Sequence, residues 1–166
     1  MQVNIALLTV TDTRNIDTDK SGAILVKKIK EQKHNLIDRK MVKDEKKEIK
    51  KVLLGWLKRK ELDVIITTGG TGLTGRDITP ETIKEIADKE IPGFGELFRE
   101  LSYKTVGTSA MQSRACAVLA NGKYIFALPG SSGGVTDAWD EILRYQLDIN
   151  HKPCNFVELF PRLKEK

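Results

Sequence analysis

The feature that most constrains the fold is an alternation of short apolar runs with amphipathic segments. Residues 3–11 form a nearly continuous run of apolar and β-branched residues, and residues 63–68 form a shorter one. Runs of this kind are typical of strands that are covered on both faces of a sheet. Residues 21–33 and the segment after Asp44 carry apolar residues at helical spacing. The clearest set follows the pattern i, i+3, i+4, i+7 and i+8 and consists of Ile49, Val52, Leu53, Trp56 and Leu57.

Capping and turn residues predict the remaining elements. Residues 34–42 alternate weakly and predict a second strand. Thr79-Pro80-Glu81 predicts a helix start, with Thr79 as the N-cap and Pro80 at the first helical position. Pro92 is expected to interrupt the helical structure, and a second short helix is expected to follow over residues 95–103.

A hairpin and a final helix complete the predicted order. Asn121-Gly122 separates two apolar runs, residues 114–120 and 123–128, and this dipeptide favours a type I′ turn. A last helix is expected over residues 135–147. Strands that alternate with helices predict an α/β fold, in which helices cover both faces of a mostly parallel sheet. The hairpin adds an antiparallel edge.

Composition limits the possible functions. The chain of 166 residues shows no linker or repeat and is expected to form one domain over residues 1–166. Its net charge of +5 comes largely from helical lysines, which we interpret as a solvated surface that suits a phosphate-rich ligand and not nucleic acid. No apolar run has the length of a membrane span and no signal peptide is visible, so a cytoplasmic protein without membrane contact is expected. Cys116, Cys154, His34 and His151 are isolated, which argues against a transition-metal site.

Three loops carry the residues from which chemistry is expected, and each follows a predicted strand. They are Thr11-Asp12-Thr13-Arg14, the Gly-rich segment from Thr67 to Asp77, and residues 128–134. Ligands of open α/β sheets bind at the carboxyl ends of the strands, so the three loops should converge. Glycine and hydroxyl residues near helix N-termini favour an anion that is held by backbone N–H groups.

The second loop contains a sequence that imitates a dinucleotide fingerprint. Residues 70–75 match GxGxxG and follow a strand. The fingerprint requires that its glycines open a helix at once and that an acidic residue follow about 20 positions later at a strand end. Here Arg76-Asp77-Ile78 intervenes before the helix, and no Gly-Lys-Ser/Thr follows. We therefore reject both an NAD site and a Walker A loop.

A phosphate loop followed by a carboxylate is the better interpretation. Asp77 beside a bound phosphate would be repelled unless a cation lay between them, and Mg²⁺ commonly bridges one or two carboxylates and substrate phosphates. Asp44 is a candidate for the second carboxylate. Two structural alternatives stay open at this point: Asp44 as a plain helix cap, and Asp77 as a turn residue.

Together these segments resemble the molybdopterin-binding family of molybdenum cofactor biosynthesis proteins, in its B-type (MoaB) branch. The resemblance covers nearly the whole chain, and the last two matching segments are more similar to the B-type than to the G-type (MogA) adenylyltransferases. The matching segments are residues 11–14, 67–72, 76–81, 92–96, 107–115, 128–131 and 153–156. One departure is Ser-Ser-Gly-Gly after Pro129-Gly130, where adenylyltransferase relatives commonly carry an Asn-Pro type turn.

The resemblance implies a three-layer α/β/α fold and an activity. The implied reaction is the adenylylation of molybdopterin by Mg-ATP, which gives adenylyl-molybdopterin and pyrophosphate. Asp44 and Asp77 match the family's paired acidic positions and are expected to bind Mg²⁺ and orient the phosphates. The remaining candidates are a phosphate-binding group (Gly69, Gly70, Thr71 and Gly72), a group at the pterin end (Pro129, Gly130 and Ser131) and further pocket residues (Asp12, Arg14 and Arg76).

Two other functions are compatible with the same residues, and the resemblance also implies an oligomeric state. A non-catalytic carrier of molybdopterin or a precursor needs the same phosphate loop, and so does a nucleotide pyrophosphatase. The resemblance implies a homo-oligomer, a trimer or a hexamer, and contact with other enzymes of the pathway. Apolar residues in the glycine-interrupted segment 93–111 are predicted to form the subunit interface, or alternatively to cap the sheet edge.

Overall fold

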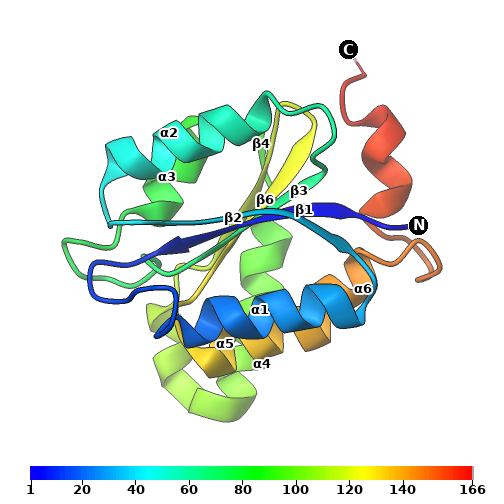
Figure 1. The fold of residues 1–166 in the computed structure, drawn as a ribbon. Helices are drawn as coiled ribbons and strands as arrows, with labels where there is room; N and C mark the ends of the chain where they lie inside the picture. The colour runs from blue at the N-terminus through cyan, green and yellow to red at the C-terminus, as the bar shows by residue number, and fades with distance from the viewer. Residues whose placement is uncertain (166) are drawn as a thin grey trace.

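The computed structural model of this chain describes residues 1–165. Within these residues six strands are separated by helices, as the apolar runs predict, except that the last two strands follow each other directly (Figure 1). The strands are β1 (Asn4–Val10), β2 (Asn35–Val42), β3 (Val64–Thr68), β4 (Lys89–Glu90), β5 (Cys116–Ala120) and β6 (Lys123–Leu128). The α-helices are α1 (Lys20–Glu31), α2 (Lys46–Leu57), α3 (Thr79–Glu85), α4 (Pro92–Val106), α5 (Ser132–Ala138) and α6 (Arg144–Gln146).

Three helical segments of other kinds complete the chain. They are η1, a 3₁₀ helix over Gly107–Gln112; η2, a π-helical segment over Trp139–Leu143; and η3, a 3₁₀ helix over Val157–Arg162. The last predicted helix, residues 135–147, is therefore three consecutive segments, α5, η2 and α6, that span residues 132–146. No helix among residues 1–165 combines the length and the apolar character that a membrane crossing requires.

The strands form one mixed sheet in the order β2-β1-β3-β6-β5-β4. Neighbours from β2 to β6 pair in parallel, whereas β5 pairs antiparallel with both β6 and β4. The predicted fold class, a mostly parallel sheet with an antiparallel edge, is confirmed. Asn121 and Gly122 have φ values of 47° and 69°, the left-handed backbone that a type I′ turn requires at both positions.

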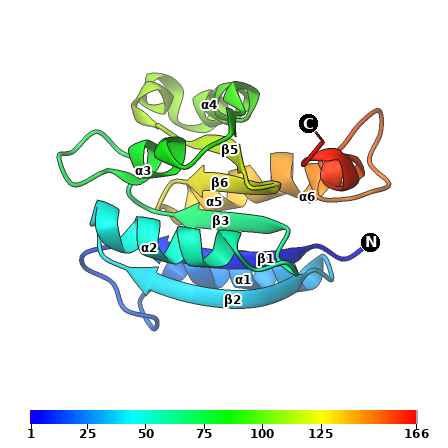
Figure 2. The ribbon, with the colours of Figure 1, turned by 90° about the horizontal axis from the view of Figure 1, so that it is seen from above.

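Helices cover both faces of the sheet and form a three-layer arrangement (Figures 1 and 2). Alternate residues of β1 enter different cores: Ile5 and Leu7 pack in one, Ala6 and Leu8 in the other. The first core includes residues of α1, α4 and α5, and the second includes residues of α2 and α3. Strands that are buried on both faces explain why their sequence is almost continuously apolar.

Several predicted helix boundaries are wrong. For α2 and α3, the residue that was predicted to cap the helix does not occupy the N-cap position. Asp44 does not cap α2, because Glu45 occupies the N-cap position and makes no side-chain cap hydrogen bond. The N-cap of α3 is Ile78, and the Thr79 hydroxyl donates instead to the Gly69 carbonyl oxygen at 3.0 Å. Pro92 does not interrupt a helix: it opens α4, which continues to Val106 and not only to Tyr103.

Candidate functional site

The three predicted loops meet at the carboxyl ends of β1, β3 and β6. The Arg14 guanidinium, after β1, donates to the Gly130 carbonyl oxygen at 2.9 Å. The Thr68 hydroxyl, at the end of β3, donates to the Pro129 carbonyl oxygen at 2.8 Å, and the Gly69 N–H donates to Leu128 at 3.0 Å. Parallel pairing places these strand ends at the same edge of the sheet, so the convergence expected from the sequence is confirmed.

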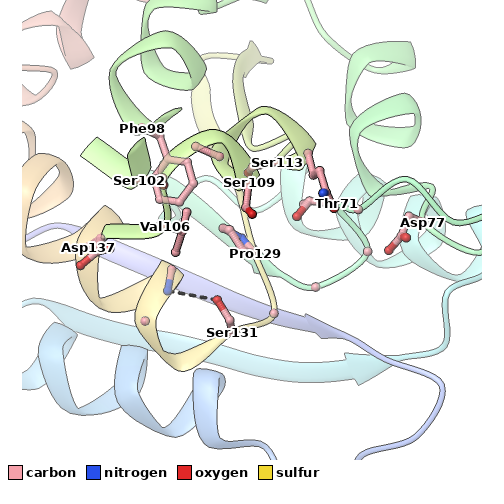
Figure 3. Close-up of a pocket in the computed structure, with 18 of the residues that line it drawn as sticks. Thr71, Asp77, Phe98, Ser102, Val106, Ser109, Ser113, Pro129, Ser131 and Asp137 are labelled. Atoms are coloured by element: carbon pink, nitrogen blue, oxygen red, sulfur yellow. Dashed lines mark hydrogen bonds between the residues drawn. The ribbon is translucent and has the colours of Figure 1, made fainter. Parts of the chain in front are cut away.

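Two adjoining hollows lie where the loops meet. The larger, of about 810 Å³, is lined by residues of all three loops and by α4 and η1 (Figure 3). The smaller, of about 270 Å³, contains the acidic side chains Asp12 and Asp44 together with Arg76. Five residues line both hollows: Arg14, Gly69, Gly70, Asp77 and Gly130. Each of the twelve site residues proposed from the sequence lines one hollow or the other.

Two carbonyl groups of the Gly-rich loop are fixed by hydrogen bonds from Thr79. The Gly69 and Gly70 carbonyl oxygens accept hydrogen bonds from the hydroxyl and the N–H of Thr79, each at 3.0 Å. In a trans peptide the C=O and the following N–H point in opposite directions. The N–H groups of Gly70 and Thr71, two residues that line the larger hollow, therefore point away from Thr79. This is the backbone arrangement that binds phosphate.

Gly70 allows this loop to lie close to its neighbours. Its φ is +67°, a conformation that costs residues with a side chain. A Cβ atom at this position would lie 2.4 Å from the Thr79 Oγ1 atom and 2.7 Å from the Asp44 Oδ1 atom. The Asp44 carboxylate is thus in immediate contact with the Gly-rich loop.

The carboxylate of Asp77 is fixed by the loop itself. Its Oδ2 atom accepts hydrogen bonds from the N–H of Thr74 at 2.9 Å and from the Thr74 hydroxyl at 2.6 Å. Partial burial acts to raise the pKa of Asp77, but these hydrogen bonds and one from the Gly72 N–H outweigh it, so the pKa lies below its ordinary value. Asp77 therefore presents a charged, oriented carboxylate to both hollows.

Asp44 experiences the opposite environment. Burial raises its pKa, and the negative charges of Asp12 and Asp77 raise it further. Asp12 has a pKa below its ordinary value, chiefly because Arg76 donates two hydrogen bonds to it, at 2.9 and 3.1 Å. Arg76 also contacts Glu45 at 2.9 Å.

Among residues 1–165, no group of three or more His, Cys, Asp or Glu side chains is arranged to hold a metal ion. The carboxylates in this site could therefore hold a cation only together with oxygen atoms of water or of a ligand.

Sequence reasoning missed the wall of the larger hollow. One face of α4 contributes Phe98, Ser102, Thr105 and Val106, and η1 follows with Ser109 and Ala110 (Figure 3). The positions 98, 102 and 105 follow helical spacing, which could have revealed a shared face. The signal was missed because the helix was expected to end at Tyr103.

The use of segment 93–111 as a subunit interface stays a prediction, and the structure limits which of its residues could take part. Phe94 and Phe98 are buried in the core and are unavailable to a partner. Leu97, Tyr103 and Met111 are exposed, and Met111 most of all, with 80% of its surface accessible. Ser131 lines the larger hollow, and its hydroxyl accepts a hydrogen bond from the Gly134 N–H at 3.1 Å and caps α5, so its role at the pterin end stays a prediction.

Comparison with known proteins identifies the family. The family described as "Probable molybdopterin binding domain" matches residues 6–149. Molybdenum cofactor biosynthesis protein B of Escherichia coli (strain K12) is 42% identical over 161 residues, which cover 97% of this chain and 93% of that protein. The protein of the same name from Staphylococcus aureus (strain MRSA252) is 47% identical over 149 residues and 88% of each chain.

Solved structures agree with the sequence relatives. A crystal structure of molybdenum cofactor biosynthesis protein B has a TM-score of 0.89 and 38% identity, and covers 100% of this chain and 98% of that chain. The tungsten cofactor synthesizing protein MoaB from Pyrococcus furiosus has a TM-score of 0.77 and 35% identity, over 86% of this chain and 91% of that chain. The chain therefore belongs to the molybdopterin-binding family of molybdenum cofactor biosynthesis proteins, in its protein B (MoaB) branch.

Proposed function

We propose that this protein binds molybdopterin and adenylylates it with Mg-ATP, which makes it a molybdopterin adenylyltransferase. In this reaction the terminal phosphate of molybdopterin attacks the α-phosphorus of ATP, and pyrophosphate leaves as the bond to the β-phosphate breaks. Nucleotidyl transfer needs little covalent chemistry from the protein and depends on positioning and charge neutralisation. The site should therefore offer oriented donors to phosphates and a surface for the pterin.

One observation carries the proposal: a backbone N–H loop lies between two carboxylates and opens into a largely apolar hollow. Gly70 and Thr71 turn their N–H groups away from Thr79, while Asp44 contacts the loop at Gly70 and Asp77 contacts it at Gly72. A site that only attracts anions gains nothing from carboxylates. Two carboxylates in contact with a phosphate loop are expected where a cation and a polyphosphate bind together.

The residues present are compatible with Mg²⁺. Asp44 and Asp77 both line the smaller hollow, and the part of the chain that the structure describes holds no cluster of three or more His, Cys, Asp or Glu that would form a cage. Mg²⁺ commonly binds in this way, through one or two carboxylates and substrate phosphates. The ion would neutralise phosphate charge when bound. The protein itself holds Asp77 in place through Thr74 and binds phosphate oxygens through the loop N–H groups.

The larger hollow suits the pterin. Phe98, Val106 and Ala110 give one wall apolar character, and the polar groups of Ser102 and Ser109 lie among them. Sites for flat heteroaromatic ligands combine mostly apolar walls with a few polar groups that set the orientation. We assign the pterin to this wall and the phosphates to the loop between Gly69 and Asp77.

A non-catalytic carrier is the second candidate, and the Arg76 contacts favour it. The Arg76 guanidinium is held by Asp12 and Glu45, so it is not free to neutralise charge that develops during transfer. A protein that only binds molybdopterin has no need of such a group. The names of the relatives give a role in cofactor biosynthesis and specify no reaction.

Incubation with molybdopterin, ATP and Mg²⁺ tests the proposal. The adenylylated product is detected by mass spectrometry and pyrophosphate by a coupled assay, and a parallel sample contains EDTA. We expect both products in equal amounts, with none in the EDTA sample. If molybdopterin binds in calorimetric titration but neither product forms, the protein is a carrier and the adenylyltransferase proposal is rejected.

A further inference from the structure

Arg114 lies behind the phosphate loop and contacts three of its carbonyl groups. Its backbone N–H donates to the Thr71 oxygen at 3.0 Å, its Nε atom to the Gly72 oxygen at 2.7 Å, and its Nη2 atom to the Asp77 oxygen at 2.9 Å. The third guanidinium nitrogen contacts the carboxylate of Glu81 in α3. Arg114 precedes β5, so this support comes from a part of the chain well separated from the loop.

These contacts orient the part of the loop that Thr79 does not reach. Because C=O and N–H are opposed in a trans peptide, the bonds to Thr71 and Gly72 turn the N–H groups of Gly72 and Leu73 away from Arg114. The Gly72 N–H consequently meets the Asp77 carboxylate, where it helps to lower the pKa of that group. The bond to the Asp77 carbonyl anchors the main chain of the same residue.

Arg114 contacts the loop from outside the larger hollow. The lining of that hollow includes Ser113 but, among residues 1–165, not Arg114. Arg114 instead lines a separate cavity of about 440 Å³, together with Glu81 and Arg99. A role as a direct ligand of the substrate is therefore not supported, and any effect on the site must pass through the loop.

We infer that Arg114, held by Glu81, is a positioning residue that fixes Gly72 and Asp77 for binding of the magnesium–polyphosphate group. The inference rests on the proposed function. The backbone N–H bond to Thr71 remains in any variant at position 114, so the test concerns the side-chain bonds to the Gly72 and Asp77 oxygens. A guanidinium makes both bonds and the Glu81 contact at once, because its N–H donors lie in one rigid plane, whereas the lysine ammonium places its donors on a single atom. Arg114→Lys keeps the positive charge and loses the planar arrangement of N–H donors, so this variant separates the effect of geometry from the effect of charge.

Calorimetric titration with magnesium pyrophosphate tests this role without a need for turnover. Loss of a residue that orients ligating groups typically lowers affinity by about 10–100-fold. We expect that loss in Arg114→Ala and most of it in Arg114→Lys. The matched control is Arg59→Ala, since Arg59 is similarly half-buried and makes two ion pairs, with Asp38 and Glu61, outside the loop. Its affinity should equal that of the unmodified protein.

Two further measurements separate positioning from simple loss of stability. Added guanidinium chloride at low concentration should restore pyrophosphate binding to Arg114→Ala, while potassium chloride should not. Glu81→Gln should weaken binding in the unmodified protein but add nothing in the Arg114→Ala background, because Glu81 acts through Arg114. Should Arg114→Ala not fold, Arg114→Lys and the Glu81→Gln single variant give the same comparison.

The outcomes distinguish the inference from the proposed function. If the unmodified protein binds pyrophosphate and both Arg114 variants bind it equally well, the positioning role is overturned while the proposed function stands. Additive effects of Glu81→Gln and Arg114→Ala also overturn it. If the unmodified protein does not bind magnesium pyrophosphate, the phosphate site itself is rejected, and the inference is rejected with it.

Discussion

Replacement of Gly70 by alanine is the most direct test of the phosphate loop. The backbone at Gly70 has φ +67°, and an added Cβ atom would meet the Thr79 Oγ1 atom at 2.4 Å and the Asp44 Oδ1 atom at 2.7 Å. Both distances are too short for a carbon atom, so the loop must shift or the two side chains must move; because the Thr79 hydroxyl is held by its bond to the Gly69 oxygen, we expect the loop to shift. The shift displaces the N–H groups of Gly70 and Thr71, which are the groups that we assign to phosphate.

The magnitude follows from two contributions. A left-handed conformation costs a residue with a side chain about 1–2 kcal/mol. The clash with Thr79 also breaks its hydrogen bond to the Gly69 oxygen, which contributes about 1 kcal/mol. We expect the free energy of unfolding to fall by about 2–3 kcal/mol, which corresponds to a decrease in Tm of about 5–10 °C for a chain of this size. Gly70→Val adds a β-branched side chain and should abolish measurable ligand binding.

Denaturant unfolding and calorimetric titration with ATP and with molybdopterin measure the two effects. Gly75→Ala is the matched control in the same loop, because no atom lies within 4 Å of its added Cβ. Its stability should change by less than about 1 kcal/mol and its binding should not change. Glutamine at Lys46, Lys47, Lys50 and Lys51 together should also leave binding unchanged, whereas attraction to a general basic surface predicts the reverse order. Normal binding by Gly70→Val, together with weak binding by the lysine variant, would refute the assignment of phosphate to this loop.

Three further predictions concern catalysis, assembly and pH. Asp77→Asn should lower pyrophosphate release by at least about 100-fold while molybdopterin still binds in titration; near-normal turnover would contradict a role in charge neutralisation. Exposed Leu97 and Met111 should lie in a subunit interface, so light scattering should give a multiple of the 18.6 kDa chain mass and not a single chain at micromolar concentration. Burial lowers the pKa of His34, so the unfolded chain takes up the proton first and stability should fall as pH drops below about 6.5. Urea unfolding at several pH values should show that His34→Gln removes this dependence and His151→Gln does not; an unchanged slope in both variants would count against the burial effect.

The sheet was predictable because its physical signals are local. A strand that is buried on both faces must be apolar throughout, so residues 3–11 and 63–68 could be recognised without neighbours. The turn at Asn121-Gly122 needs two left-handed residues, and its sequence meets that need. Convergence of the loops followed from the parallel order of the strands, since ligands of such sheets bind at one edge.

Errors occurred where a polar side chain has a distant partner. Thr79 and Asp44 both have the chemistry of an N-cap, and a local pattern assigns them that role. In the structure Thr79 bonds to Gly69, and the Asp44 carboxylate lies against Gly70. Nothing in the sequence around Arg114 reveals that its partners are the carbonyls of Gly72 and Asp77, so this contact could not be predicted.

Asp44 and Asp77, the candidate metal ligands, are held very differently, and this difference has a consequence for binding. Asp77 is fixed by Thr74 at its carboxylate and by Arg114 at its carbonyl, so it is organised before any ligand arrives. Asp44 lies partly buried near two other carboxylates, and burial and their charges raise its pKa. Positive charge that enters the hollow would stabilise the ionised form of Asp44. Under the proposed function, we therefore expect Asp77 to define where the phosphate group binds and Asp44 to make binding of that group depend on an accompanying cation.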